Sequence, residues 1–226
     1  MQTDRELCAE IKLYYDLLLP ENQTNPAPLL IAIHGYGGNK RHMMREARAL
    51  APPNFAVAAL QGFHQHWRTL EAEPGKMPKV GFAWLTDYKS EDSVVVHHRA
   101  VGDLIQILIR EGTADAGQIF LLGFSQACAL NFRFAFTNPD LLRGVVGISG
   151  GIPGDWETSE AYQNLTAPVL YVYGDDDEFY PLKKLDENAR KLTERAANLQ
   201  TKCYQGKHEI TDQMRADIKN WLQENI

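Results

Sequence analysis

The chain has 226 residues, of which 44% are hydrophobic and 23% charged, and its formal net charge is −6. This balance is typical of a globular protein with a sizeable core and argues against wholesale disorder. A mildly acidic surface repels phosphates and anionic lipids, so we expect neither a nucleic-acid partner nor stable membrane insertion.

Short apolar runs alternate with longer helical patterns, and neither a repeat nor a low-complexity linker divides the chain. We interpret the apolar runs as strands and the longer segments as helices. In chain order the patterns predict one or two edge strands within 8–19, a strand at 29–33, a helix at 39–50, a strand at 56–60, a loop at 61–90, a helix from 90 to near 112, a strand at 118–123, a helix at 126–136, strands at 145–148 and 169–173, a helix at 182–197, a strand at 199–204 and a helix at 210–225. This order predicts an α/β fold in a single domain over 1–226, with a doubly wound, mostly parallel sheet and helices on both faces.

Two local features of this prediction concern the middle of the chain. The segment 61–90 carries glycines, prolines, histidines and tryptophans without a clear period, which is typical of a long functional loop facing a substrate. The next helix is expected to be capped by Ser90 or Asp92.

A serine follows the strand at 118–123, at the edge of the sheet where parallel α/β proteins bind ligands. The sequence Gly-Phe-Ser-Gln-Ala at 123–127 has small residues two positions to either side of Ser125, and a helical pattern follows directly. A strained strand-to-helix turn needs such small neighbours, and it presents the serine Oγ as a nucleophile. The alternative interpretation is that Ser125 only caps the helix.

An activating base and acid are expected in the chain order serine, acid, histidine. Asp175, Asp176 and Asp177 follow the strand at 169–173, and on this evidence each of them is a candidate, although a solvated turn or a weak cation site is an alternative. His208 follows the strand at 199–204 and is the only histidine after Asp177. Its alternative role is that of an incidental surface residue.

A tetrahedral intermediate also needs N–H donors for its oxyanion. The sequence His-Gly-Tyr-Gly-Gly at 34–38 follows the strand at 29–33, and its glycines allow the backbone to approach a substrate closely. We predict that the N–H groups of Tyr36 and Gln126 form the oxyanion hole, and that His34 fixes the loop by hydrogen bonds rather than acting as a base. The loop lacks the complete pattern of a phosphate-binding motif.

Four stretches together resemble the phospholipase/carboxylesterase branch of the α/β-hydrolases, which includes the acyl-protein thioesterases. These are the loop at 34–38, Gly-Phe-Ser-Gln at 123–126, Ile-Ser-Gly-Gly-Ile-Pro at 148–153 and the Gly-Asp-x-Asp-x-x-x-Pro turn at 174–181. The resemblance covers nearly the whole chain. It implies an α/β-hydrolase fold with Ser125 as nucleophile, Asp177 as the acid, His208 as the base, and oxyanion N–H groups at Tyr36 and Gln126.

The chain departs from that family at three places. Ala127 stands where the family usually has glycine, and Glu-Phe-Tyr at 178–180 replaces an apolar pair before Pro181. Trp-Leu-Thr-Asp at 84–87 is similar to a family Trp-Phe-Asp element but lacks its phenylalanine. These departures concern the surroundings of the predicted site rather than its reacting groups.

Three residues of the segment 61–90 are predicted to line the substrate cleft: His64, Trp67 and Trp84. His64 and His66 alternate in a strand-like pattern without nearby carboxylates, so we expect no metal site. The three cysteines are widely spaced, which predicts neither a disulfide framework nor a zinc site.

The predicted activity is that of a serine hydrolase that cleaves carboxylic esters through an acyl-enzyme, with no cofactor and a small-molecule ester or thioester as its partner. A thioesterase or small peptidase would use the same triad, and a non-catalytic hydrolase-like binding module is a further alternative. No apolar run resembling a signal peptide follows Met1, so we expect a cytoplasmic monomer or homodimer.

Overall fold

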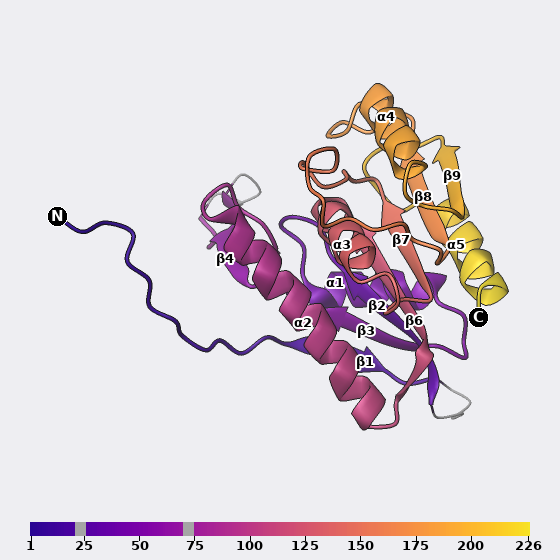
Figure 1. Ribbon diagram of the computed structural model, residues 1–226, viewed down its shortest axis with the longest axis horizontal. Coiled ribbons are helices and arrows are strands. Elements are labelled where there is room, and N and C mark those ends of the chain that lie inside the picture. Colours follow the sequence, from indigo (N-terminus) through magenta and orange to yellow (C-terminus); the bar gives the residue numbers. More distant parts are fainter. Residues whose placement is uncertain (21–25, 70–74) are drawn as a thin grey trace.

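In the computed structural model, which describes residues 1–20, 26–69 and 75–226, seven strands of the described chain form one central sheet (Figure 1). The order across the sheet is β1-β3-β2-β6-β7-β8-β9. Only β1 runs antiparallel to its neighbour, β3, and the remaining neighbours in this sheet are parallel. The strands are β1 (Tyr15–Leu18), β2 (Ala27–Ile33), β3 (Ala56–Leu60), β6 (Ala114–Phe124), β7 (Gly144–Ile148), β8 (Val169–Gly174) and β9 (Leu199–Tyr204).

Helices cover both faces of the sheet (Figure 1). They are α1 (Lys40–Leu50), α2 (Ser90–Arg110), α3 (Gln126–Thr137), α4 (Leu182–Leu192) and α5 (Asp212–Glu224). Successive residues of a strand point to opposite faces, so Ile31 packs into the core beneath α2, α3 and α4 while Leu30 packs into the core beneath α1 and α5. The predicted α/β fold, a doubly wound, mostly parallel sheet with helices on both faces, is therefore confirmed.

Most predicted elements occur at the expected places, with differences at their ends. Residues 1–14 form neither strand nor helix, so the predicted edge strand is restricted to Tyr15–Leu18. The helix expected at 182–197 ends at Leu192, because Arg195 and Ala197 pair their backbones with Leu165 instead. No described helix is long and apolar enough to cross a bilayer.

The predicted cap of α2 is wrong. The helix already begins at Ser90, and the residue before it, Lys89, has a left-handed backbone (φ 50°) with no side-chain capping bond. Neither Ser90 nor Asp92 therefore occupies the position from which a side chain accepts the first free N–H groups.

The prediction of an irregular loop at 61–90 is also wrong in part, because this segment contains an antiparallel hairpin. Its strands are β4 (His64–Trp67) and β5 (Val80–Ala83), while 70–74 lie outside the described residues. The alternation in β4 joins polar and aromatic side chains rather than aliphatic ones, so its strand signal is weak. Phe82 exchanges backbone hydrogen bonds with Gly37 and Gly38, which attaches the hairpin to the loop after β2.

Candidate active site

Ser125 occupies a tight turn between β6 and α3. Its backbone has φ 57° and ψ −120°, a conformation that residues other than glycine rarely adopt. The N–H of Ser125 donates to the carbonyl of Ile148 at 2.8 Å, which ties the turn to β7. A Cβ at Gly123 would lie only 2.7 Å from Nδ2 of Asn131, whereas the methyl group of Ala127 is accommodated in the core. The turn therefore has the backbone of a nucleophile elbow, with alanine tolerated at the second small position.

The side chains of Ser125, His208 and Asp177 form one continuous line of hydrogen bonds. Nε2 of His208 lies 2.9 Å from Oγ of Ser125, and Nδ1 lies 2.8 Å from Oδ2 of Asp177. The other carboxylate oxygen of Asp177 accepts the N–H groups of Phe179 and Tyr180, each at 2.9 Å. A carboxylate held in this way fixes the imidazole with Nε2 free to accept the serine proton.

Of the three neighbouring aspartates, the structure brings only Asp177 to the imidazole. Asp175 and Asp176 are exposed, and Oδ1 of Asp175 accepts the N–H of Gly206. The side chain of Asp177 is fully buried. Glu178 is close as well, but it accepts the backbone N–H of His208 at 3.0 Å and does not meet the ring.

Aromatic rings enclose the imidazole of His208. The ring centroids of Phe124 and Phe179 lie 4.9 Å from it, and the ring of Tyr180 stacks on it at 5.8 Å. Only 11% of the His208 side chain is exposed. Because these rings keep water away, the hydrogen bonds of the line act in a medium of low polarity, where they are stronger.

The loop after β2 lies directly against Ser125. A Cβ at Gly35 would lie 2.9 Å from Cβ of Ser125, so only glycine permits this approach. The N–H groups of Tyr36 and Gln126 have no hydrogen-bond partner within the described part of the chain. Two free donors beside the hydroxyl of Ser125 are the arrangement that an oxyanion at this position would require.

His34 holds this loop in place. Its Nδ1 donates to the carbonyl of Gly35 at 2.7 Å, and its Nε2 accepts the N–H of Gly62 at 3.0 Å. Burial lowers the pKa of His34 to about 4, so the ring is neutral at pH 7 and able to accept a hydrogen bond. These contacts agree with the predicted loop-fixing role.

Trp84 does not line a cleft, contrary to the prediction. It is completely buried, and its indole N–H donates to the carbonyl of His34 at 2.9 Å. Its backbone N–H donates to Oε1 of Gln126, whose Nε2 in turn donates to the carbonyl of Leu85. Trp84 therefore holds the loop after β2 through its bond to His34. The side chain of Gln126 joins α3 to residues 84–85. Sequence patterns gave no indication of this second role of Gln126.

The other two predicted cleft residues lie on β4. Nε2 of His64 lies 2.9 Å from Oγ of Ser93 on α2, and Trp67 is 55% exposed. Neither residue lines the clefts described below. His66, which the sequence considered only as a metal ligand, stacks its ring on Tyr36 with a centroid distance of 4.6 Å.

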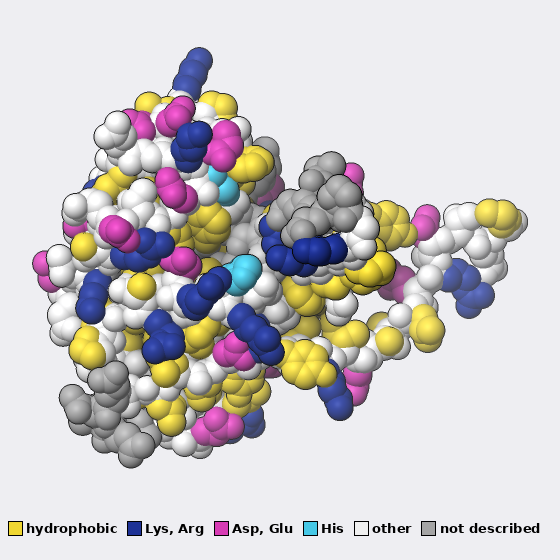
Figure 2. Space-filling view, turned by 180° about the vertical axis from the view of Figure 1, so that it is seen from behind, with side chains coloured by type: hydrophobic (Ala, Val, Ile, Leu, Met, Phe, Trp, Pro, Cys, Tyr) yellow, Lys and Arg dark blue, Asp and Glu magenta, His cyan; other side chains and the backbone are white. Residues whose placement is uncertain are grey.

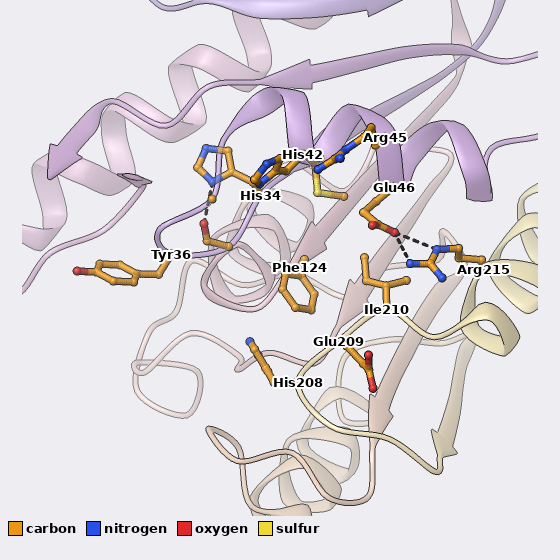
Figure 3. A pocket seen from close by; sticks show the side chains of 13 residues that line it. His34, Tyr36, His42, Arg45, Glu46, Phe124, His208, Glu209, Ile210 and Arg215 are labelled. Carbon is orange, nitrogen blue, oxygen red and sulfur yellow. Dashed lines mark hydrogen bonds and ion pairs between the residues drawn. The ribbon is translucent and has the colours of Figure 1, made fainter. Parts of the chain in front are cut away.

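Two clefts flank Ser125. The first, here called the His208 cleft, has a volume of about 410 Å³ and lies between His208, the loop after β2 and α1 (Figure 3). The second, the Gln126 cleft, has a volume of about 370 Å³ and is lined by Gln126, Tyr180 and Ile152 among others. On the face seen in Figure 2, lysine and arginine side chains gather over α1, whose sequence contains four of them.

The chain is similar to several known proteins along much of its length. It is 29% identical over 171 residues to NocK of Nocardia uniformis subsp. tsuyamanensis, covering 74% of this chain and 44% of that protein. It is 31% identical over 131 residues to acyl-protein thioesterase 1 of Yarrowia lipolytica (strain CLIB 122 / E 150), covering 54% and 57%. The chain thus spans about half the length of the curated relatives it matches.

A solved structure of a Bacillus cereus carboxylesterase has the same fold, with a TM-score of 0.71 and 18% identity over 95% of both chains. The sequence model of the phospholipase/carboxylesterase family matches residues 19–226. This match includes the elbow, the loop after β2 and the turns that carry Asp177 and His208. The chain therefore belongs to the phospholipase/carboxylesterase family.

Proposed function

We propose that this protein is a serine hydrolase that cleaves carboxylic esters through an acyl-enzyme on Ser125. The observation that carries the proposal is the line of hydrogen bonds from Ser125 through His208 to Asp177, at 2.9 and 2.8 Å. Family membership supports the same reaction. The relatives include acyl-protein thioesterases, so thioesters are a second candidate substrate for the same three groups.

The proposed reaction begins when His208 takes the proton of Ser125 and Oγ attacks the ester carbonyl. The N–H groups of Tyr36 and Gln126 donate to the resulting oxyanion, and Asp177 stabilises the imidazolium. The imidazolium then gives its proton to the leaving alcohol as the carbon–oxygen bond breaks. A water molecule, deprotonated by His208, attacks the acyl-enzyme, and the returning proton restores Ser125.

The test is hydrolysis of 4-nitrophenyl acetate by a Ser125→Ala variant. We expect kcat to fall by about 10⁴-fold or more, because the remaining groups cannot form the covalent intermediate. Ser159→Ala removes a hydroxyl outside both clefts and should retain the activity of the parent. Turnover by Ser125→Ala at the rate of the parent would overturn the proposal, and a parent that does not hydrolyse the ester at all would favour a binding module without catalysis.

Location, oligomeric state and the range of partners are predicted from the sequence alone. A cytoplasmic location, a monomeric or homodimeric state and a lack of nucleic-acid partners stay predictions from the sequence. We also propose that the segment 61–90 influences substrate choice, because its hairpin is bonded to Gly37 and Gly38 and its residues 84–85 are bonded to Gln126.

A further inference from the structure

The two clefts beside Ser125 are suited to different parts of an ester substrate. This inference rests on the proposed function. A leaving alcohol receives its proton from Nε2 of the imidazole, so it must lie on the side of His208. His208 lines the first cleft and is not among the residues that line the Gln126 cleft. The leaving group therefore occupies the His208 cleft, and the acyl group extends toward the Gln126 cleft.

The His208 cleft contains an exposed arginine side chain, that of Arg45. Arg45 of α1 is exposed and lines this cleft, and it forms no ion pair with any acidic residue of the described chain. It lies beside His42, one turn earlier on the same helix (Figure 3). The carboxylate of Glu209, which also lines the cleft, points away from the side chains of α1 in this view.

The other cations of both clefts are neutralised by acidic neighbours. Arg215 donates to Glu46 at 2.7 and 2.9 Å and to Asp212 at 2.7 Å. In the Gln126 cleft, Lys191 donates to Glu157 at 2.7 Å, and Lys184 lies 3.6 Å from Glu187. Of the described residues that line the two clefts, Arg45 is therefore the arginine or lysine whose charge remains to be matched by a ligand.

The surroundings of Arg45 favour a specific contact. Met43 and Ile210 are buried and, with Phe124, give the cleft an apolar floor. An anion held above apolar surface attracts a cation more strongly than it does in open water. A guanidinium also presents two parallel N–H donors, which match the oxygens of a carboxylate or a phosphate.

We propose that Arg45 binds a carboxylate or phosphate carried by the leaving alcohol or thiol, so that the protein prefers esters with an anionic leaving group. Arg45 is a specificity residue in this proposal. It contacts the substrate away from the scissile bond and takes no part in the proton transfers.

The test compares two butanoate esters of similar size, 4-carboxyphenyl butanoate and 4-carbamoylphenyl butanoate, which differ in the charge of the leaving group. Arg45→Gln should lower kcat/KM for the carboxylate ester about tenfold, the loss of one charge-assisted contact, and change the amide ester less than about twofold. Arg41→Gln removes an equal charge from the same helix outside the cleft lining and should leave both values unchanged. Equal losses for both esters, or the same effect from Arg41→Gln, would overturn the proposal.

A second pair of esters tests the assignment of sides. 4-Nitrophenyl hemisuccinate carries its carboxylate on the acyl group, and 4-nitrophenyl pentanoate is its neutral counterpart. Arg45→Gln should leave the ratio of their kcat/KM values unchanged, and a selective loss on the hemisuccinate would contradict the placement of the leaving group. If the parent hydrolyses the neutral esters through Ser125 without any charge preference, this inference fails alone. If it hydrolyses none of the esters, the proposed function itself fails.

Discussion

At the scale of single residues, Asp177 uses its two carboxylate oxygens differently. Oδ1 accepts two backbone N–H groups, and Oδ2 meets Nδ1 of His208. In Asp177→Asn, the amide N–H₂ group would face Nδ1 while the carbonyl kept the two backbone bonds. The ring would then carry its proton on Nε2 and could not accept the serine proton.

We therefore expect kcat of Asp177→Asn for 4-nitrophenyl butanoate to be about 10⁴-fold lower at neutral pH, with the fold unchanged by circular dichroism. Asp176→Asn is the matched control, because that carboxylate is exposed and does not meet His208. If kcat fell as much in Asp176→Asn as in Asp177→Asn, the loss could not be due to the hydrogen bond between Asp177 and His208.

Sequence patterns predicted the three groups that meet at the candidate site better than the residues that hold them in place. Ser125 and His208 follow predicted strands in a fixed order, so local patterns identify them, while Asp177 was separated from its neighbours by the family resemblance. The burial of Trp84 depends on its packing beneath the loop after β2, where it meets His34, and a sequence window does not contain that information. Arg45 sits on an amphipathic helix, where a cleft residue and a solvent-exposed residue have the same pattern.

At the scale of elements, the elbow depends on close contact between β7 and α3. A Cβ at Gly150, just after β7, would lie 2.2 Å from the carbonyl oxygen of Ser125 and 2.6 Å from Sγ of Cys128. Since neither backbone nor a buried side chain can yield by that amount, Gly150→Ala must displace the elbow. Gly154, four residues later, has open space around its Cβ position.

We expect Gly150→Ala to lose at least about 1–3 kcal/mol of unfolding free energy, the usual cost of overpacking, and most of its esterase activity. Gly154→Ala should match the parent in unfolding free energy, because no atom lies within 4 Å of its Cβ position. Urea unfolding and 4-nitrophenyl butanoate turnover measure the two effects, and a fully active Gly150→Ala protein would contradict the described packing at the elbow.

The fold itself was largely predictable from alternating elements, because buried parallel strands form continuous apolar runs such as 29–33 and 169–173. The hairpin of β4 and β5 was not. Its first strand, His-Gln-His-Trp at 64–67, lacks aliphatic residues, and the bonds of Phe82 to Gly37 and Gly38 join segments far apart in the sequence. Pairing over such distances determines structure without leaving a local pattern.

At the scale of the whole molecule, buried neutral histidines make stability depend on pH. Burial lowers the pKa from its ordinary value of 6.5 to about 4 in His34, about 3 in His97 and about 4 in His98. Below pH 6.5 these histidines therefore bind protons in the unfolded chain but not in the folded chain. Stability is full above that pH and is lost as the pH falls toward the folded-state pKa values.

Each such histidine should lower the free energy of unfolding by roughly 1.4 kcal/mol for each unit that the pH falls between about pH 6 and 4. His97→Phe keeps a ring against Trp84 and removes one titrating group, so its unfolding free energy should decline less steeply in this range. Urea unfolding at several pH values gives the slope of unfolding free energy against pH for the parent and for His97→Phe. Identical slopes in the parent and His97→Phe would contradict a neutral buried His97.

Labelling with a fluorophosphonate probe, followed by mass spectrometry of the digested protein, measures directly whether Ser125 is an activated nucleophile. The reagent bonds to a serine only when a neighbouring base activates it. We expect one adduct, on the peptide that contains Ser125, no adduct in Ser125→Ala and strongly slowed labelling in His208→Ala. An adduct on another residue, or continued ester cleavage by a protein whose Ser125 is unreactive, would contradict this expectation.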